Sequence, residues 1–172
     1  TLVSATTDLT LDVSTFSNWK LIAKQADSDE QLFSSNAKST FLENENDSSQ
    51  STFMSIGNLD KSNYADTDEK YKFKLVWGGK SVDSSDINKE VTWTQTSWLD
   101  NSTTQEFQEI GVSGFNTDAD PNTDFVGLAL STNSECVFDG DGGKVSDKWF
   151  NCVGVINLWN VSMPGPLRKK AS

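Results

Sequence analysis

Oxygen-bearing side chains recur at every second position in one stretch of the sequence, a pattern typical of calcium-binding loops. The four residues are Asp118, Asp120, Asn122 and Asp124. In a calcium loop, oxygens at alternate positions wrap around a single ion. Only the first half of such a loop matches, because Thr123 stands where the turn glycine belongs and Ala129 where the bidentate glutamate belongs. The pattern predicts a calcium site, and a solvated polar turn is the alternative interpretation.

The two cysteines of the chain, Cys136 and Cys152, enclose a loop rich in glycine and aspartate. Pairing is the default for two cysteines in a secreted protein, and closing a loop of this size stabilises the fold by about 3 kcal/mol in the chain-entropy model. Two buried thiols that pack as small hydrophobes are the alternative. The loop also carries Asp139, Asp141 and Asp147, so we expect a second candidate cation site at its tip.

Three tryptophans suit a sugar-binding surface. They are Trp98, Trp149 and Trp159, which lie at the ends of predicted strands or out of phase with neighbouring core residues. An aromatic ring can stack on the apolar face of a pyranose, while carboxylates or a calcium ion bind the sugar hydroxyls. The alternative is that these rings pack in the core or at its rim, as aromatic residues of strands usually do.

The composition removes the commonest catalytic groups. The sequence holds no histidine, which excludes Ser-His and Cys-His pairs and imidazole-bound zinc. A glycosidase needs two carboxylates that face one bond, but Glu106 and Glu109 are three residues apart and would point to opposite faces of a strand. Nucleophile elbows, phosphate loops and dinucleotide fingerprints are also missing from the sequence. We therefore predict that the protein is not an enzyme.

Charge and hydropathy limit which partners and which cellular compartment are expected. The formal net charge is -11 and the pI is about 4.3, so neither nucleic acid nor anionic lipid is an expected partner. No stretch is apolar over the roughly 18–20 residues that a membrane-spanning helix needs, and no membrane insertion is expected. The chain opens with Thr1 rather than Met, which fits a removed secretory leader. Glycosylation sequons at Asn46, Asn101 and Asn160 fit a secreted protein.

Strands are the elements that must position these residues. Alternating or apolar-rich segments predict strands at 9–13, 19–25, 52–56, 71–77, 91–98, 107–112, 125–131 and 149–158. The alternation is clearest at 71–77, where Tyr71, Phe73, Leu75 and Trp77 would face the core and two lysines would face water. The polar segment 27–51 predicts a long loop, with one short helix around 39–44.

Strands without intervening helices predict an all-β fold, as an antiparallel β-sandwich or jelly roll in one domain. We expect an N-terminal extension at 1–8, the sandwich domain at 9–163 and a basic C-terminal tail at 164–172. Two prolines around a glycine end the last strand before that tail.

An ordered set of short motifs extends this prediction. The motifs are WKLIAKQ at 19–25, FKLVW at 73–77, WTQT at 93–96, GLALS at 127–131, WFNCVG at 149–154 and MPGP at 163–166. In this order they resemble a module found in secreted or surface proteins of marine invertebrates and microalgae, over residues 16–166. The resemblance implies an extracellular or cell-surface location and a β-fold, and it brings no assigned biochemical activity.

These observations predict a non-catalytic structural or adhesive module of an extracellular surface assembly, such as an appendage, matrix or coat. Its partners would be other extracellular proteins or copies of itself. A lectin-like module that binds glycans with calcium as a cofactor is the alternative. The module that the chain resembles has a further strand after the Pro-Gly-Pro motif, whereas Arg168, Lys169 and Lys170 follow here. Either that last strand is dispensable, or this chain has an open sheet edge that could accept a strand from a neighbour.

Overall fold

The computed structural model describes residues 8–15, 18–26, 38–80, 86–113, 127–130, 137–140 and 152–153. Within these ranges every long element is a β-strand, the only helices are short 3-10 turns, and there is no α-helix. The strands are β1 (Asp8–Ser14), β2 (Trp19–Ala26), β3 (Thr52–Met54), β4 (Tyr71–Lys80), β5 (Asp86–Gln95), β6 (Gln108–Ser113), β7 (Ala129–Leu130), β8 (Phe138–Asp139) and β9 (Cys152–Val153). The protein is therefore all-β, as the sequence predicts.

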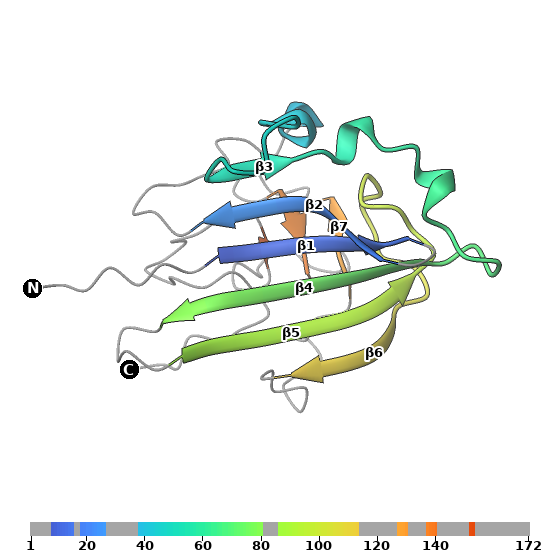
Figure 1. Ribbon diagram of the computed structural model, residues 1–172. Helices are drawn as coiled ribbons and strands as arrows, with labels where there is room; N and C mark the ends of the chain where they lie inside the picture. Colours follow the sequence, from blue (N-terminus) through green and yellow to red (C-terminus); the bar gives the residue numbers. More distant parts are fainter. Residues whose placement is uncertain are drawn as a thin grey trace, which may run out of the picture.

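Six strands form one antiparallel sheet, the large sheet, in the order β3-β2-β1-β4-β5-β6. Strands β1 and β2 pair as neighbours in sequence, and so do β4 and β5, while β1 joins the two pairs by lying beside β4. The three remaining strands form a small sheet in the order β7-β8-β9. Figure 1 looks onto the large sheet, with the small sheet behind it.

Alternation decides which face of the large sheet is buried. In β4, Tyr71, Phe73 and Leu75 are buried while Lys72 and Lys74 are half-buried on the other face. Strand β5 repeats the pattern, with buried residues at 91, 93 and 95 and half-buried threonines between them. Because successive side chains of a strand point to opposite faces, the sequence pattern alone fixes this orientation. The predicted orientation of the strand at 71–77 is confirmed for its described side chains.

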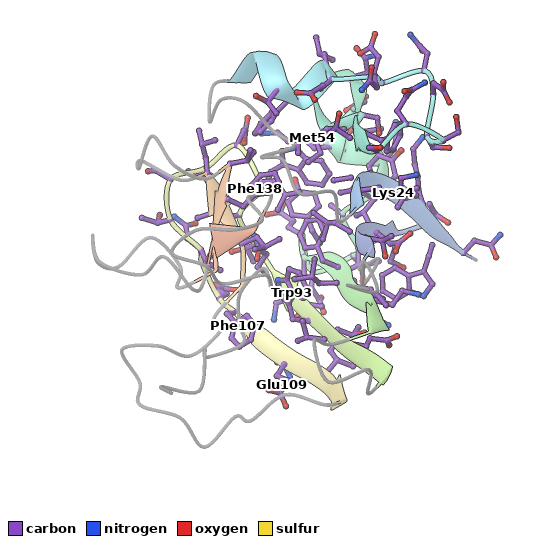
Figure 2. All side chains as sticks on the ribbon, turned by 90° about the vertical axis from the view of Figure 1, so that its left-hand side faces the viewer. Lys24, Met54, Trp93, Phe107, Glu109 and Phe138 are labelled. Atoms are coloured by element: carbon purple, nitrogen blue, oxygen red, sulfur yellow. The ribbon has the colours of Figure 1, made fainter. Side chains whose placement is uncertain are left out.

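The small sheet covers the inner face of the large sheet. Its buried residue Phe138, with Val137 just before β8 and Leu128 just before β7, belongs to the same hydrophobic cluster as the inner residues of β1, β4 and β5. Figure 2 shows Met54 and Trp93 of the large sheet between the layers and Phe138 on the opposite layer. Two packed antiparallel layers around one core result, and the choice between sandwich and jelly roll stays a prediction.

Aromatic rings fill one end of this core. Trp98 follows β5 and packs edge-on against Tyr71 with ring centroids 4.9 Å apart, and its ring lies 5.7 Å from Phe73. Tyr64 stacks on Trp98 at 6.1 Å. Aromatic pairs at such separations contribute about 0.5–1.5 kcal/mol beyond the burial of their area. Ring packing thus adds to the hydrogen bonds that hold the turn after β5, such as the one from the Thr96 N–H to the Gln105 carbonyl at 3.0 Å.

A buried amide ties the two layers together. Gln95, the last residue of β5, is fully buried, and its Oε1 accepts hydrogen bonds from Trp93 Nε1 at 2.8 Å and from the Leu128 N–H at 3.1 Å. Its Nε2 donates to the carbonyl oxygens of Ser97 and Leu128 at 2.8 and 2.9 Å. A buried polar group is tolerated only when it is hydrogen-bonded, and this amide uses both its oxygen and its nitrogen.

Several predicted elements differ from those observed. Strand β8 (Phe138–Asp139) was expected to be part of a loop. The expected strand at 91–98 begins earlier and ends at Gln95, because Ser97 and the residues after it turn into the core. The short helix expected at 39–44 is a 3-10 helix, η1, at Lys38–Leu42. The expected long loop contributes to the core through Phe41, whose ring lies 5.7 Å from that of Phe138.

In the described part of the chain, no helix combines the length and apolar character that crossing a membrane requires.

Candidate functional site

The outer face of the large sheet is the surface on which strand pairing gathers polar side chains around an exposed aromatic ring. We define it by Trp19 and Leu21 of β2, Asp12 and Ser14 of β1, Lys72 and Lys74 of β4, and Thr92 and Thr94 of β5. Asp12 pairs with both Leu21 and Lys74, and Lys74 pairs with Thr92, so these residues form one row across the sheet. Ser14 pairs with Trp19, and Lys72 with Thr94, in the next positions.

Trp19 is held on this face by two lysines. The Nζ atoms of Lys74 and Lys72 lie 4.7 and 5.6 Å from the centre of the Trp19 ring. A cation over an indole ring at an exposed site contributes about 0.5–1 kcal/mol. Trp19 remains 36% exposed, whereas Trp93 and Trp98 are buried. Trp19 therefore carries a ring that contacts two cations and is still partly open to solvent.

Asp12 is the acidic group in the middle of the outer face. Burial among its neighbours raises the pKa of its carboxyl group above the ordinary value, the ammonium group of Lys74 lowers that pKa, and the carboxylate of Glu90 raises it. Burial is the largest of the three effects, so the ionised form of Asp12 is less favourable in the folded protein than in the unfolded chain. The carboxyl group thus accepts a proton more readily than a free aspartate.

We expect Asp12→Asn to raise the free energy of unfolding at neutral pH. Because the folded pKa of Asp12 is raised, the folded state binds its proton at higher pH than the unfolded chain does. This group therefore favours folding as the pH falls through its folded pKa, and disfavours it above that value. Chemical denaturation from pH 7 to pH 4 should show the gain of the variant shrinking as the pH falls. Asp68→Asn, at an exposed turn, is the control, and a pH-independent difference would contradict the assignment.

Of the three tryptophans predicted to bind a sugar, Trp98 is the one whose side chain the structure describes. The predicted sugar-binding role of Trp98 needs correction. Its side chain is 5% exposed, and its ring contacts Tyr64, Tyr71 and Phe73. A ring so enclosed cannot stack on a sugar, so Trp98 is a core residue. Its position past the end of β5 is where the chain bends into the core. Trp149 and Trp159 lie outside the described residues, and their predicted role stays a prediction.

The predicted cation sites are mostly outside the described residues. Asp118, Asp120, Asn122, Asp124 and Asp141 are not described. Asp139 is described only as part of β8, paired with residues of β7 and β9, and so does not lie at the tip of a loop as expected. Among the described residues, no three His, Cys, Asp or Glu side chains gather closely enough to hold a metal ion.

The structure describes only some of the residues predicted to form the disulfide and the glycosylation sites. Cys136 lies outside the described residues and Cys152 is described by its backbone in β9, so the disulfide stays a prediction. The sequons at Asn46 and Asn101 carry exposed asparagines in turns, the second one just after β5. Exposure is necessary for glycosylation and does not establish it. Asn160 lies outside the described residues.

The sequence did not single out Trp19, because a β-bulge changes the phase of its strand. Leu11 pairs with Ala23 and Asp12 with Leu21, so β2 holds one extra residue at this point. Strict alternation would place Trp19 and Ala23 on the same face. With the bulge, Ala23 joins the core and Trp19 lies on the outer face. No signal in the sequence separates this tryptophan from the core tryptophans.

Comparison of the chain with protein families, with characterised proteins and with solved structures finds no match in any of the three.

Proposed function

We propose that the protein is a non-catalytic structural or adhesive module of an extracellular surface assembly, and that it associates with copies of itself through strand β6. One observation carries the proposal. Strand β6 is the last strand of the large sheet among the described residues, and its Ile110 is 52% exposed. A strand at the edge of a sheet presents backbone groups that can pair with a strand of another chain. The absence of histidine from the sequence agrees with a role without acid–base catalysis.

The local geometry of β6 limits how much of its edge a second strand can pair with. The ladder between β5 and β6 shifts at Ile110, because Glu109 pairs with Trp93 and Gly111 with Thr92. A bulge of this kind bends the edge, and an exposed Glu109 places a charge on it. Both features oppose aggregation of many chains. A second copy that supplies its own β6 in antiparallel orientation is the partner that such an edge would accept.

We expect Ile110→Lys to weaken self-association at least about tenfold, because a lysine on an edge strand opposes strand addition. Sedimentation equilibrium of the whole chain over a wide concentration range measures the dissociation constant. Leu42→Lys is the matched control, because Leu42 is also exposed, at 45%, but lies in η1. A wild-type chain that stays monomeric at the highest concentration would contradict the proposal, as would equal weakening by both variants.

Carbohydrate binding is a second candidate function, and the exposed Trp19 favours it. A fixed aromatic ring surrounded by hydroxyl, carboxyl and ammonium groups matches the groups that a sugar needs: a stacking surface and hydrogen-bonding partners. Calcium would be the cofactor only if the undescribed aspartates bind it. Binding of the whole chain to a panel of immobilised polysaccharides, with and without a chelator, tests both points. If the chain binds none of the polysaccharides in the presence of calcium, carbohydrate binding is contradicted.

An extracellular compartment is part of the same proposal. A disulfide between Cys136 and Cys152 and glycans at exposed asparagines would suit it, and the net charge of -11 would keep such a protein soluble. The proposed partners are other extracellular proteins, further copies of the chain, and glycans.

A further inference from the structure

The geometry points to the outer face around Trp19 as a binding site for an anionic saccharide, in which the ring stacks on a pyranose and Lys72 and Lys74 bind its carboxylate or sulfate group. This inference rests on the carbohydrate-binding candidate and names the ligand class for it.

Two ammonium groups gather at this ring, and the carboxyl groups of Asp12 and Glu90 lie on the same face of the sheet. Both ammonium groups lie within a few ångströms of the same indole, at 4.7 and 5.6 Å from its centre. Two like charges held near one another repel, and an anion placed beside them removes that repulsion. The chain as a whole carries a formal charge of -11, so an anionic group would be disfavoured over much of the surface. Charge complementarity therefore selects this face over an average part of the surface.

Two carboxyl groups, those of Asp12 and Glu90, moderate the charge of the lysines. Asp12 shares its row with Lys74, and burial raises the pKa of its carboxyl group. Lys72 pairs with Thr94 rather than with an acidic residue. Asp12 in either form can hydrogen-bond a sugar hydroxyl.

Hydroxyl groups continue the surface beyond the lysines. Thr92 pairs with Lys74, and Thr94 with Lys72, and both threonines are half-buried on the same face. Ser14 lies beside Trp19. Neighbouring strands are about 4.8 Å apart, so the step from β2 across β1 to β4 spans roughly 10 Å, enough for a short oligosaccharide rather than a single small ion. The site combines one aromatic ring, two cations and several hydroxyl groups on four adjacent strands.

Titration calorimetry of the whole chain tests the inference with two pairs of ligands. Oligogalacturonate is compared with its carboxyl-reduced, uncharged form, and dextran sulfate oligosaccharide with uncharged dextran of the same length. We expect binding of at least one anionic member and binding about tenfold weaker, or none, for its uncharged partner. The pair that responds tells whether carboxylate or sulfate is the group recognised.

Three variants connect the binding to this face. Trp19→Ala, Lys72→Gln and Lys74→Gln should each weaken binding of the anionic ligand, by about five- to tenfold. The two lysine variants should also reduce the preference for the charged ligand, which loss of structure elsewhere would not do selectively. Lys61→Gln removes the same charge from an exposed position in the 3-10 helix η3 (Lys61–Asn63) and should bind as the wild type does. Thermal unfolding of each variant confirms that it is folded.

The possible outcomes separate the inference from the function on which it rests. Equal binding of charged and uncharged ligands, lost in Trp19→Ala, would overturn the anionic ligand and keep carbohydrate binding. Anionic binding that is unchanged in all three variants would overturn this site. No binding of any saccharide would overturn both the inference and the carbohydrate-binding candidate. Self-association through β6 is measured separately and is independent of all three results.

Discussion

Gln95→Leu should lower the free energy of unfolding by about 3–5 kcal/mol, because a buried hydrogen-bonded amide is replaced by a side chain without polar atoms. The substitution removes the oxygen that accepts the hydrogen bond of Trp93 Nε1. It also removes both hydrogen bonds between the Gln95 side chain and the backbone of Leu128. Leucine is similar in size to glutamine, so the loss comes from polar groups rather than from a cavity. Urea denaturation followed by circular dichroism measures the change.

The same substitution at an exposed strand position is the matched control. Gln108 is the first residue of β6 and is exposed, so Gln108→Leu should change the free energy of unfolding by no more than about 0.5 kcal/mol. Gln95→Glu is informative as a second variant, because it keeps an acceptor for Trp93 and loses the donor to the carbonyls of Ser97 and Leu128. If Gln95→Leu were as mild as Gln108→Leu, the amide would not be the link between the layers.

Gly127→Ala is expected to destabilise the fold by about 2–4 kcal/mol, because two separate penalties act at this residue. Its φ of +92° is a backbone conformation that residues with a side chain rarely adopt. A Cβ atom there would also lie 2.6 Å from both Gln95 Oε1 and Thr104 Cγ2. The glycine thus lets the backbone before β7 approach the buried amide closely. Thermal and urea unfolding measure the change.

Gly111→Ala provides the comparison for this glycine. Gly111 lies in β6 with nothing within 4 Å of its added Cβ, so alanine should be neutral or slightly stabilising there, by up to about 1 kcal/mol. Because Gly127 and Gln95 are in contact, their substitutions should not be additive. A double-mutant cycle of Gly127→Ala and Gln95→Leu should show a coupling energy of about 0.5 kcal/mol or more. Strict additivity would mean that the two residues act separately.

These expectations concern stability, and they bear on function through the sheet that both residues support. Gln95 ends β5, and Thr92 and Thr94 of the same strand lie on the outer face. The buried residues of β5 therefore hold Thr92 and Thr94 in place on the outer face. Ligand-binding measurements on destabilised variants should be made only under conditions in which each variant is folded.

The large sheet was predictable where local pattern decides. The alternation in β4 and β5 is strong because core residues and polar residues occupy successive positions, and a strand has a side-chain period of two. The positions of Phe73 and Lys74 on opposite faces follow from this alone. Strand β8, in contrast, is two residues long and is followed by a segment rich in glycine and aspartate, so its pattern is too short to separate it from a loop.

The candidate site was not predictable in the same way. The sequence pattern predicts Trp98 as an exposed ring, but the chain turns inward after Gln95 and buries Trp98 among Tyr64, Tyr71 and Phe73. For Trp19 the pattern predicts only a position in a strand. Whether a tryptophan is a core residue or a surface residue depends on which strands cover it, and that is settled by contacts distant in sequence.

By itself, the sequence determined the all-β class, the two faces of the central strands and the absence of histidine chemistry, because these depend on residue type and on a period of two along a strand. Only the tertiary structure decided which tryptophan is open to solvent and which amide joins the layers. A one-residue bulge between β1 and β2 reverses the phase of β2 and turns Trp19 outward. Gln95 finds its partner Leu128 across 33 residues of sequence, and neither event has a local signature because both arise from pairing between distant segments.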